Sequence, residues 1–125
     1  MVAIFLPSKR RWAGFRAEAL AIVHFEQQGY HLISQNGRVG RAEVDLLLWN
    51  PDSQRLLAVE VKYRSRNWEQ LPLNPRQARR IYRAARQLRP DALRTHEPEF
   101  VLCVLSGDLE SPQIQVFANI WESWD

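Results

Sequence analysis

The sequence predicts an α/β domain in which helices pack on a mixed β-sheet. A helical apolar stripe comes first, three strand-like segments follow, and a second helical pattern precedes two further strand-like segments. The order is therefore α-β-β-β-α-β-β. Strands joined by short turns pair antiparallel, whereas a helical crossover leads to a parallel neighbour, so both kinds of pairing are expected in one sheet.

The first helix is expected over residues 8–28, where Trp12, Phe15, Ala19, Ile22 and Val23 form the apolar stripe and Gly29 provides the stop. A short strand is expected over residues 30–34, followed by a turn at Asn36-Gly37. Further strands are predicted over residues 42–49 and 56–63, with the turn-forming sequence of residues 50–53 between them.

The second half begins with a predicted loop over residues 67–74. Asn74 is a good helix N-cap and Pro75 suits the first helical position, so the second helix is expected from Pro75 to about Leu88, before Pro90. The last two strands are predicted over residues 100–105 and 114–118. The chain has 125 residues, of which 46% are hydrophobic, and this size and composition predict one domain over residues 1–125.

Two of the predicted strands carry charged residues in otherwise apolar surroundings. Asp45 interrupts one apolar run, and Glu60 and Lys62 lie two apart in the next, so both project from the same face of that strand. A turn near residues 51–53 pairs position 45 with position 59 or 60. Two carboxylates side by side repel each other unless a cation lies between them.

This arrangement predicts a Mg²⁺ site, or a Mn²⁺ site, formed by Asp45, Glu60 and the backbone carbonyl of Val61. Mg²⁺ prefers oxygen ligands and keeps several waters. Lys62, one strand step beyond, could orient the attacking water and offset charge on a phosphate. The alternative is a set of edge-strand salt bridges, for example between Asp45 and Lys62.

Two further side chains are candidates for the same site. Glu18 falls between Ile22 and Phe25 on the helical wheel, at the margin of the apolar stripe, and could point toward the sheet. A glutamate at that margin that faces solvent is the alternative. Gln77 lies on the inward face near the start of the second helix, where it could reach the site.

The second helix has an outer face that is entirely basic, formed by Arg76, Arg79, Arg80, Arg83 and Arg86. Its inner face is apolar and rich in alanine. Exposed faces usually mix the two signs of charge, so this one favours contact with the backbone of DNA or RNA over simple solvation. Binding to a membrane surface is the weaker competitor, because the apolar face is needed for the core.

The remaining composition narrows the setting. The net charge is +3, and Cys103, the single cysteine, lies in an apolar run, so it is expected to be structural. One cysteine excludes an internal disulfide, which suits a cytoplasmic protein. No run approaches the roughly 20 apolar residues of a membrane span.

In these segments the chain resembles the YraN-type proteins of the restriction-endonuclease-like (PD-(D/E)xK) nuclease superfamily, which are similar to archaeal Holliday junction resolvases. The matching stretches, over about residues 9–105, include Gly14 to Ala21, Gly29-Tyr30, Asn36 with Arg38, Ala42 to Leu47, Val59 to Arg64, and the basic helix from Pro75. The family usually has glycine at the position of Ala42. It often has lysine at that of Gln77, where related nucleases place glutamine.

The resemblance implies an αβββαβ core with Asp45, Glu60 and Lys62 as the catalytic set and Glu18 as an accessory acid. It also implies cleavage that leaves a 5′-phosphate and a 3′-hydroxyl. The leading hypothesis is thus a Mg²⁺-dependent DNA endonuclease, with branched or junction DNA among its candidate substrates. A homodimer is compatible with cutting both strands. The alternative is a non-catalytic nucleic-acid-binding or assembly module that keeps the fold.

Overall fold

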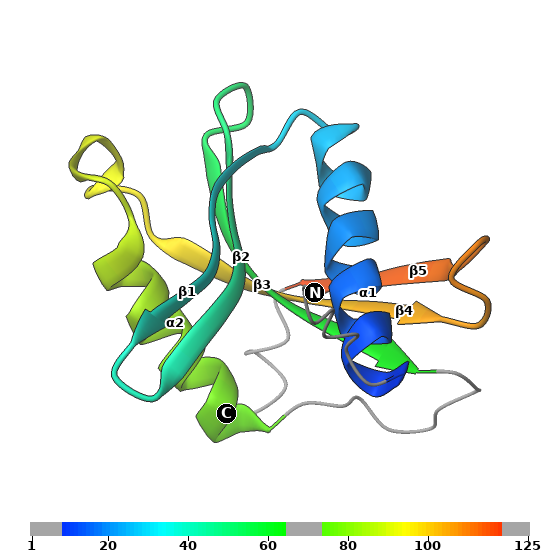
Figure 1. Ribbon diagram of the computed structural model, residues 1–125. Coiled ribbons are helices and arrows are strands. Elements are labelled where there is room, and N and C mark those ends of the chain that lie inside the picture. The colour runs from blue at the N-terminus through cyan, green and yellow to red at the C-terminus, as the bar shows by residue number, and fades with distance from the viewer. Residues whose placement is uncertain (1–8, 65–73, 119–125) are drawn as a thin grey trace, which may run out of the picture.

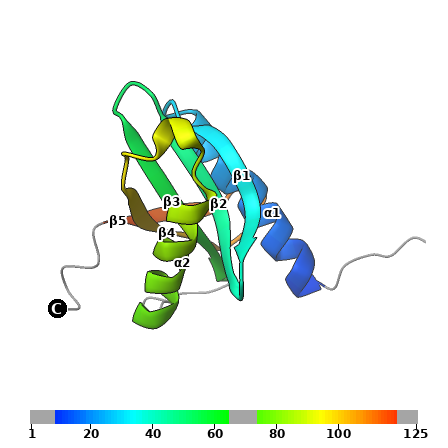
Figure 2. The ribbon, with the colours of Figure 1, turned by 90° about the vertical axis from the view of Figure 1, so that its left-hand side faces the viewer.

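A five-stranded mixed β-sheet with a helix on each face forms the framework of the molecule (Figures 1 and 2). This computed structural model describes residues 9–64 and 74–118. The elements are α1 (Lys9–Glu26), β1 (His31–Val39), β2 (Ala42–Asn50), β3 (Arg55–Arg64), α2 (Pro75–Leu88), the 3₁₀ helix η1 (Asp91–Leu93), β4 (Pro98–Ser106) and β5 (Gln113–Ala118). The predicted helix start at Ser8 lies outside the described residues, and so do residues 67–73 of the loop predicted over residues 67–74.

The strand order β1-β2-β3-β4-β5 follows the chain. The first three strands form an antiparallel meander, β3 and β4 are parallel, and β5 returns antiparallel to β4. The helix α2 makes the crossover that a parallel β3–β4 pair requires. The predicted fold class, a mixed sheet flanked by helices with an αβββαβ core, is confirmed.

The two helices cover opposite faces of the sheet, and each has its own hydrophobic core. Ala17, Ala21 and Phe25 of α1 pack on one face with Leu46, Val59 and Cys103 among others. Ala78, Ile81, Ala84 and Ala85 of α2 pack on the other face, with residues that include Ala58 and Leu102. Burial raises the pKa of the Cys103 thiol to about 12, as expected for a structural cysteine.

The second helix starts as its sequence predicts. The Asn74 side chain accepts a hydrogen bond from the Arg76 N–H at 2.8 Å, and Pro75 occupies the first helical position, where a missing N–H costs nothing. The helix ends after Leu88, before Pro90. These local signals fix where α2 begins, and therefore which of its side chains face the neighbouring strands.

The prediction for the first strand was wrong. Asn36-Gly37 does not form a turn but lies inside β1, which continues to Val39, and the actual turn contains Gly40 with φ of 60°. Asn36 adopts φ of 54°, a left-handed conformation that asparagine tolerates better than most residues. The strand absorbs this irregularity instead of ending at it.

Within the described ranges, no helix combines the length and apolar character needed to cross a membrane.

Candidate active site

The regular pairing of β2 with β3 stops beside Asp45. The ladder runs from Asn50 opposite Arg55 to Leu46 opposite Val59, and this register, continued by one step, sets Asp45 opposite Glu60. Beyond the last pair, the Asp45 side chain bonds to the neighbouring strand: its Oδ2 accepts a hydrogen bond from the Val61 N–H at 2.8 Å. A side chain thus replaces the backbone acceptor at the point where the two strands separate.

The alternation of side chains across the sheet reverses at Asp45. Leu46 packs in the core under α1, whereas Val44, two residues away, packs in the core under α2. On a regular strand both would share one face. The same reversal occurs in β1, where Gln35 bonds to Glu18 of α1 and Gly37 lies against Leu88 of α2.

Asn36 explains this reversal. In the β1–β2 register it lies between the pairs Gln35–Leu46 and Gly37–Val44, and so opposite Asp45. Its positive φ twists β1 at this point, and β2 follows. Asp45 is consequently turned out of the regular ladder and can be approached from both layers of helices.

Glu60 and Lys62 lie on β3, which is the central strand of the five and not an edge strand. Glu60 is only 6% exposed, and Lys62 Nζ lies 3.2 Å from Glu60 Oε1. The salt bridge suggested as an alternative, between Asp45 and Lys62, is therefore replaced by one between Lys62 and Glu60. Asp45 instead accepts a hydrogen bond from the Val61 N–H and shares one with the Glu60 side chain.

The two carboxylates are held where their charges are unfavourable. Burial, followed by the charge of Glu60, raises the pKa of Asp45 to about 7. Burial also raises the pKa of Glu60, although Lys62 and a hydrogen bond with Asp45 act in the opposite direction. Raised pKa values of this kind favour a proton held between the two carboxylates, and a cation placed there would relieve the same repulsion.

The side chain of Glu18 reaches the same place from α1. It accepts a hydrogen bond from Gln35 Nε2 at 3.4 Å. Burial and then the charge of Asp45 raise its pKa. Glu18 therefore lies near Asp45 and does not face bulk solvent on the far side of the domain.

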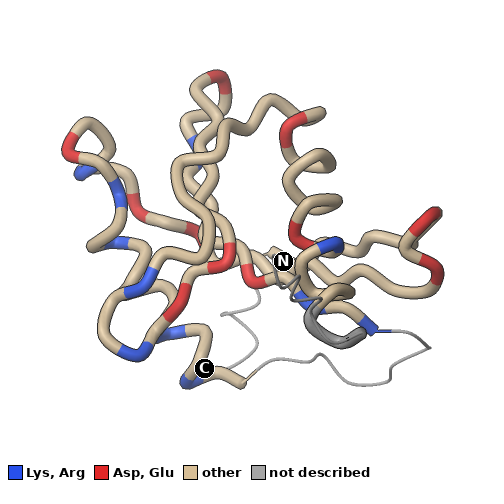
Figure 3. Tube along the Cα trace, in the orientation of Figure 1, with Lys and Arg blue, Asp and Glu red and all other residues tan. Residues whose placement is uncertain are grey.

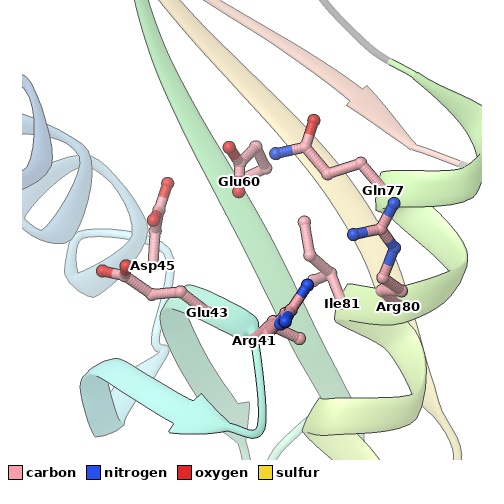
Figure 4. A pocket seen from close by; sticks show the side chains of 8 residues that line it. Arg41, Glu43, Asp45, Glu60, Gln77, Arg80 and Ile81 are labelled. Carbon is pink, nitrogen blue, oxygen red and sulfur yellow. The ribbon is translucent and has the colours of Figure 1, made fainter.

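A pocket of about 260 Å³ opens beside Asp45 and Glu60, between β2, β3 and the start of α2 (Figure 4). We call it the acid pocket. Gln77 extends from α2 toward Glu60 across it, as anticipated. Its lining comprises Arg41, Ala42, Glu43, Asp45, Glu60, Gln77, Arg80 and Ile81.

Two charged residues of this lining, Arg41 and Glu43, were not anticipated as site residues. Arg41 follows Gly40 in the β1–β2 turn. A turn residue belongs to no helical or strand repeat, so no periodic pattern in the sequence marks it as a site residue. Glu43 lies on β2, two residues before the reversal at Asp45, and is ion-paired with Arg38 at 3.3 Å. The sequence shows Glu43 close to Asp45, but the face of the sheet to which the Glu43 side chain points depends on the twist at Asn36.

The donor groups suit a small, oxygen-binding cation. No group of three or more His, Cys, Asp or Glu side chains able to hold a metal is found in the described segments. Mg²⁺ does not need one, because it commonly uses one or two carboxylates and keeps waters. The Val61 N–H points toward Asp45, and in an extended strand the carbonyl of the same residue points to the same side. Asp45, Glu60 and the Val61 carbonyl are thus a plausible donor set.

All five predicted phosphate-binding arginines of α2 are exposed. Basic residues follow α2 and the adjoining β1–β2 turn, while acidic ones lie on the strands beside them (Figure 3). Arg80 also lines the acid pocket, and Arg86 lies 3.5 Å from Glu97. The arginines thus have different neighbours, although the helical pattern of the sequence assigns all five to one face.

Comparison with known proteins identifies relatives in bacteria. A protein from Pseudomonas savastanoi pv. phaseolicola is 44% identical over 57 residues, 46% of this chain and 45% of that protein. One from Synechocystis is 37% identical over 76 residues, 58% of this chain and 51% of that protein. The chain thus spans about half the length of these two. A Pelobacter propionicus protein is 32% identical over 117 residues, 90% of this chain and 84% of that protein.

All three relatives carry the same family name, UPF0102. The model of this family, described as an uncharacterised protein family, matches residues 17–103 of the chain. The match spans Glu18, Asp45, Glu60, Lys62 and all of α2. It bears out the YraN-type resemblance at the level of the family, so this chain belongs to the uncharacterised protein family UPF0102.

Proposed function

We propose that this protein is a Mg²⁺-dependent DNA endonuclease whose active site is the acid pocket. The observation that carries the proposal is the juxtaposition of the buried Glu60 carboxylate and the half-buried Asp45 carboxylate beside a polar pocket, with Lys62 ion-paired to Glu60. A structural role alone does not account for two partly desolvated acids side by side, because removing ionised groups from water costs free energy that neither acid recovers from the other.

The proposed division of labour follows from these contacts. Asp45, Glu60 and the Val61 carbonyl would hold Mg²⁺, or Mn²⁺, which when bound polarises a phosphodiester and lowers the pKa of water. The ammonium group of Lys62 carries a positive charge beside Glu60, where it can orient the attacking water and offset charge on the phosphate. Gln77 has an amide that can donate to a phosphate oxygen across the pocket.

Glu18 is proposed as a positioning residue, since it acts on Asp45 from the opposite layer. We expect Glu18→Gln to slow cleavage by about ten- to a hundredfold, as is typical for groups that support a metal ligand. Glu26→Gln, at an exposed position on the same helix, should leave the rate unchanged. The variants are compared by single-turnover cleavage and by the pH profile of the rate. An unchanged rate and profile in Glu18→Gln would remove this residue from the site.

The experiment that tests the function is a cleavage screen with Mg²⁺ or Mn²⁺ against duplex, single-stranded, flap and four-way-junction DNA. Cleavage of at least one of these by the wild type, abolished by EDTA, supports the proposal. The product ends should be a 5′-phosphate and a 3′-hydroxyl. Binding without cleavage of any of the four would instead favour the non-catalytic nucleic-acid-binding module.

A further inference from the structure

We propose that a second hollow beside the acid pocket binds the neighbouring phosphate of the nucleic-acid backbone, through Arg41, Arg80 and Arg83. We call it the arginine groove. The inference rests on the proposed function for the nature of its ligand. It adds a phosphate subsite and divides the arginines of α2 into two groups with different roles.

The groove lies between the β1–β2 turn and the outer side of α2, and its volume is about 200 Å³. Three of its lining residues, Arg41, Ala42 and Arg80, also line the acid pocket, so the two hollows adjoin each other. The full lining comprises Val39, Arg41, Ala42, Arg80, Arg83, Ala84 and Gln87. A chain whose reacting phosphate lies by Asp45 and Glu60 would therefore have an adjacent phosphate within the groove.

The charges of the groove fit an anion. Its lining contains three guanidinium groups and no acid, whereas the acid pocket contains Glu43, Asp45 and Glu60. Val39, Ala42 and Ala84 supply apolar walls, and such walls strengthen the field of the charges that they flank. Guanidinium groups match the geometry of phosphate oxygens and can donate two hydrogen bonds to one phosphate.

The opposite side of α2 is in a different situation. Arg86 is ion-paired with Glu97 at 3.5 Å, and the Tyr82 hydroxyl donates to the same carboxylate at 2.5 Å. Part of the positive charge on that side is thus neutralised within the protein. Arg79 lies between the two sides and is not part of the groove lining. The sequence predicted one uniform basic face on α2. The structure instead places Arg80 and Arg83 in the groove beside the acid pocket and pairs Arg86 with an acid.

The test compares two triple variants that remove the same charge. Arg41→Gln/Arg80→Gln/Arg83→Gln changes the groove, and Arg79→Gln/Arg86→Gln/Arg94→Gln is the matched control, at exposed arginines that line neither hollow. Both keep polar side chains, and those on α2 keep good helix propensity. Affinity for one fixed duplex and one four-way junction is measured by fluorescence anisotropy in EDTA over a range of salt concentrations, so that no cleavage occurs. Thermal melting verifies that each variant is folded.

We expect the groove variant to bind about tenfold more weakly than the wild type, and the control about twofold. On duplex DNA the slope of log K against log salt should flatten by roughly 0.9 for each phosphate that the variant no longer neutralises. Lysine at the three groove positions keeps the charge and should restore most of the affinity. Equal weakening in both triple variants, an unchanged groove variant, or no DNA binding by the wild type would each overturn the groove.

Failure of the groove and failure of the nuclease are distinguishable, because binding is measured without metal. Selective weakening of binding in the groove variant, with no cleavage by the wild type, would retain the groove and reject the nuclease. Normal Mg²⁺-dependent cleavage by the wild type, with unchanged DNA binding in the groove variant, would retain the nuclease and reject the groove.

Discussion

Replacement of Asp45 by asparagine or of Glu60 by glutamine should lower the cleavage rate by about a thousandfold or more. A bound metal contributes several kcal/mol of transition-state stabilisation, and each 1.36 kcal/mol corresponds to roughly tenfold in rate. Each substitution removes one of the two carboxylates without changing side-chain volume. Alanine at either position, or at Lys62, should likewise abolish cleavage. The measurement is single-turnover cleavage of the substrate that the wild type cuts best.

The matched control for these acids is Glu110→Gln, which removes one negative charge at an exposed position in the β4–β5 connection. It should cut at the wild-type rate. Each variant should also melt cooperatively, so that loss of activity is not loss of fold. Wild-type rates in the Asp45, Glu60 and Lys62 variants would place the chemistry elsewhere in the protein.

Asp45→Asn should also make the metal-free protein more stable at neutral and alkaline pH, by up to a few kcal/mol in the free energy of unfolding. The pKa of Asp45 is raised to about 7 from 3.8, so the folded state holds a proton that the unfolded chain releases. Its contribution to stability is therefore greatest below pH 3.8 and is lost as the pH rises to about 7. Asparagine can still accept from the Val61 N–H, so the contact survives.

The corresponding measurement is chemical denaturation between pH 4 and pH 8. The difference between wild type and Asp45→Asn should widen across this range in favour of the variant. Mg²⁺ should reverse the order near pH 8: a ligand that binds only the folded state adds RT ln(1 + [L]/Kd), about 2.7 kcal/mol at a hundredfold excess over Kd. A difference that is independent of pH and a wild type unaffected by Mg²⁺ would argue against a desolvated, cation-binding pair.

Local signals were sufficient for much of the fold and for the central pair of acids. Asn74 and Pro75 fix the start of α2 through contacts within four residues of sequence. The short turn between β2 and β3 fixes their register, so the opposition of positions 45 and 60 follows from counting. Both are short-range effects, and a sequence pattern reports such effects directly.

The features that were missed depend on contacts between distant segments. Asn36-Gly37 has the composition of a turn, but pairing with β2 keeps it in a strand. Arg41 belongs to the site only because α2 packs beside the β1–β2 turn. Arg86 differs from the groove arginines because it is ion-paired with Glu97, a residue outside α2. No periodicity within α2 could reveal either contact.

The twist at Asn36 has a further consequence for edge-to-edge pairing of the sheet with other copies of the protein. In the sheet of the described residues, β1 is one of the two edge strands, and an edge offers unpaired backbone groups to any passing chain. A register shift between Leu32 and Ser34 and the left-handed Asn36 interrupt that edge twice. Irregularities of this kind make a strand a poor template for aggregation. The distortion that turns Asp45 out of the ladder thus also interrupts the edge at which another copy of the chain could pair.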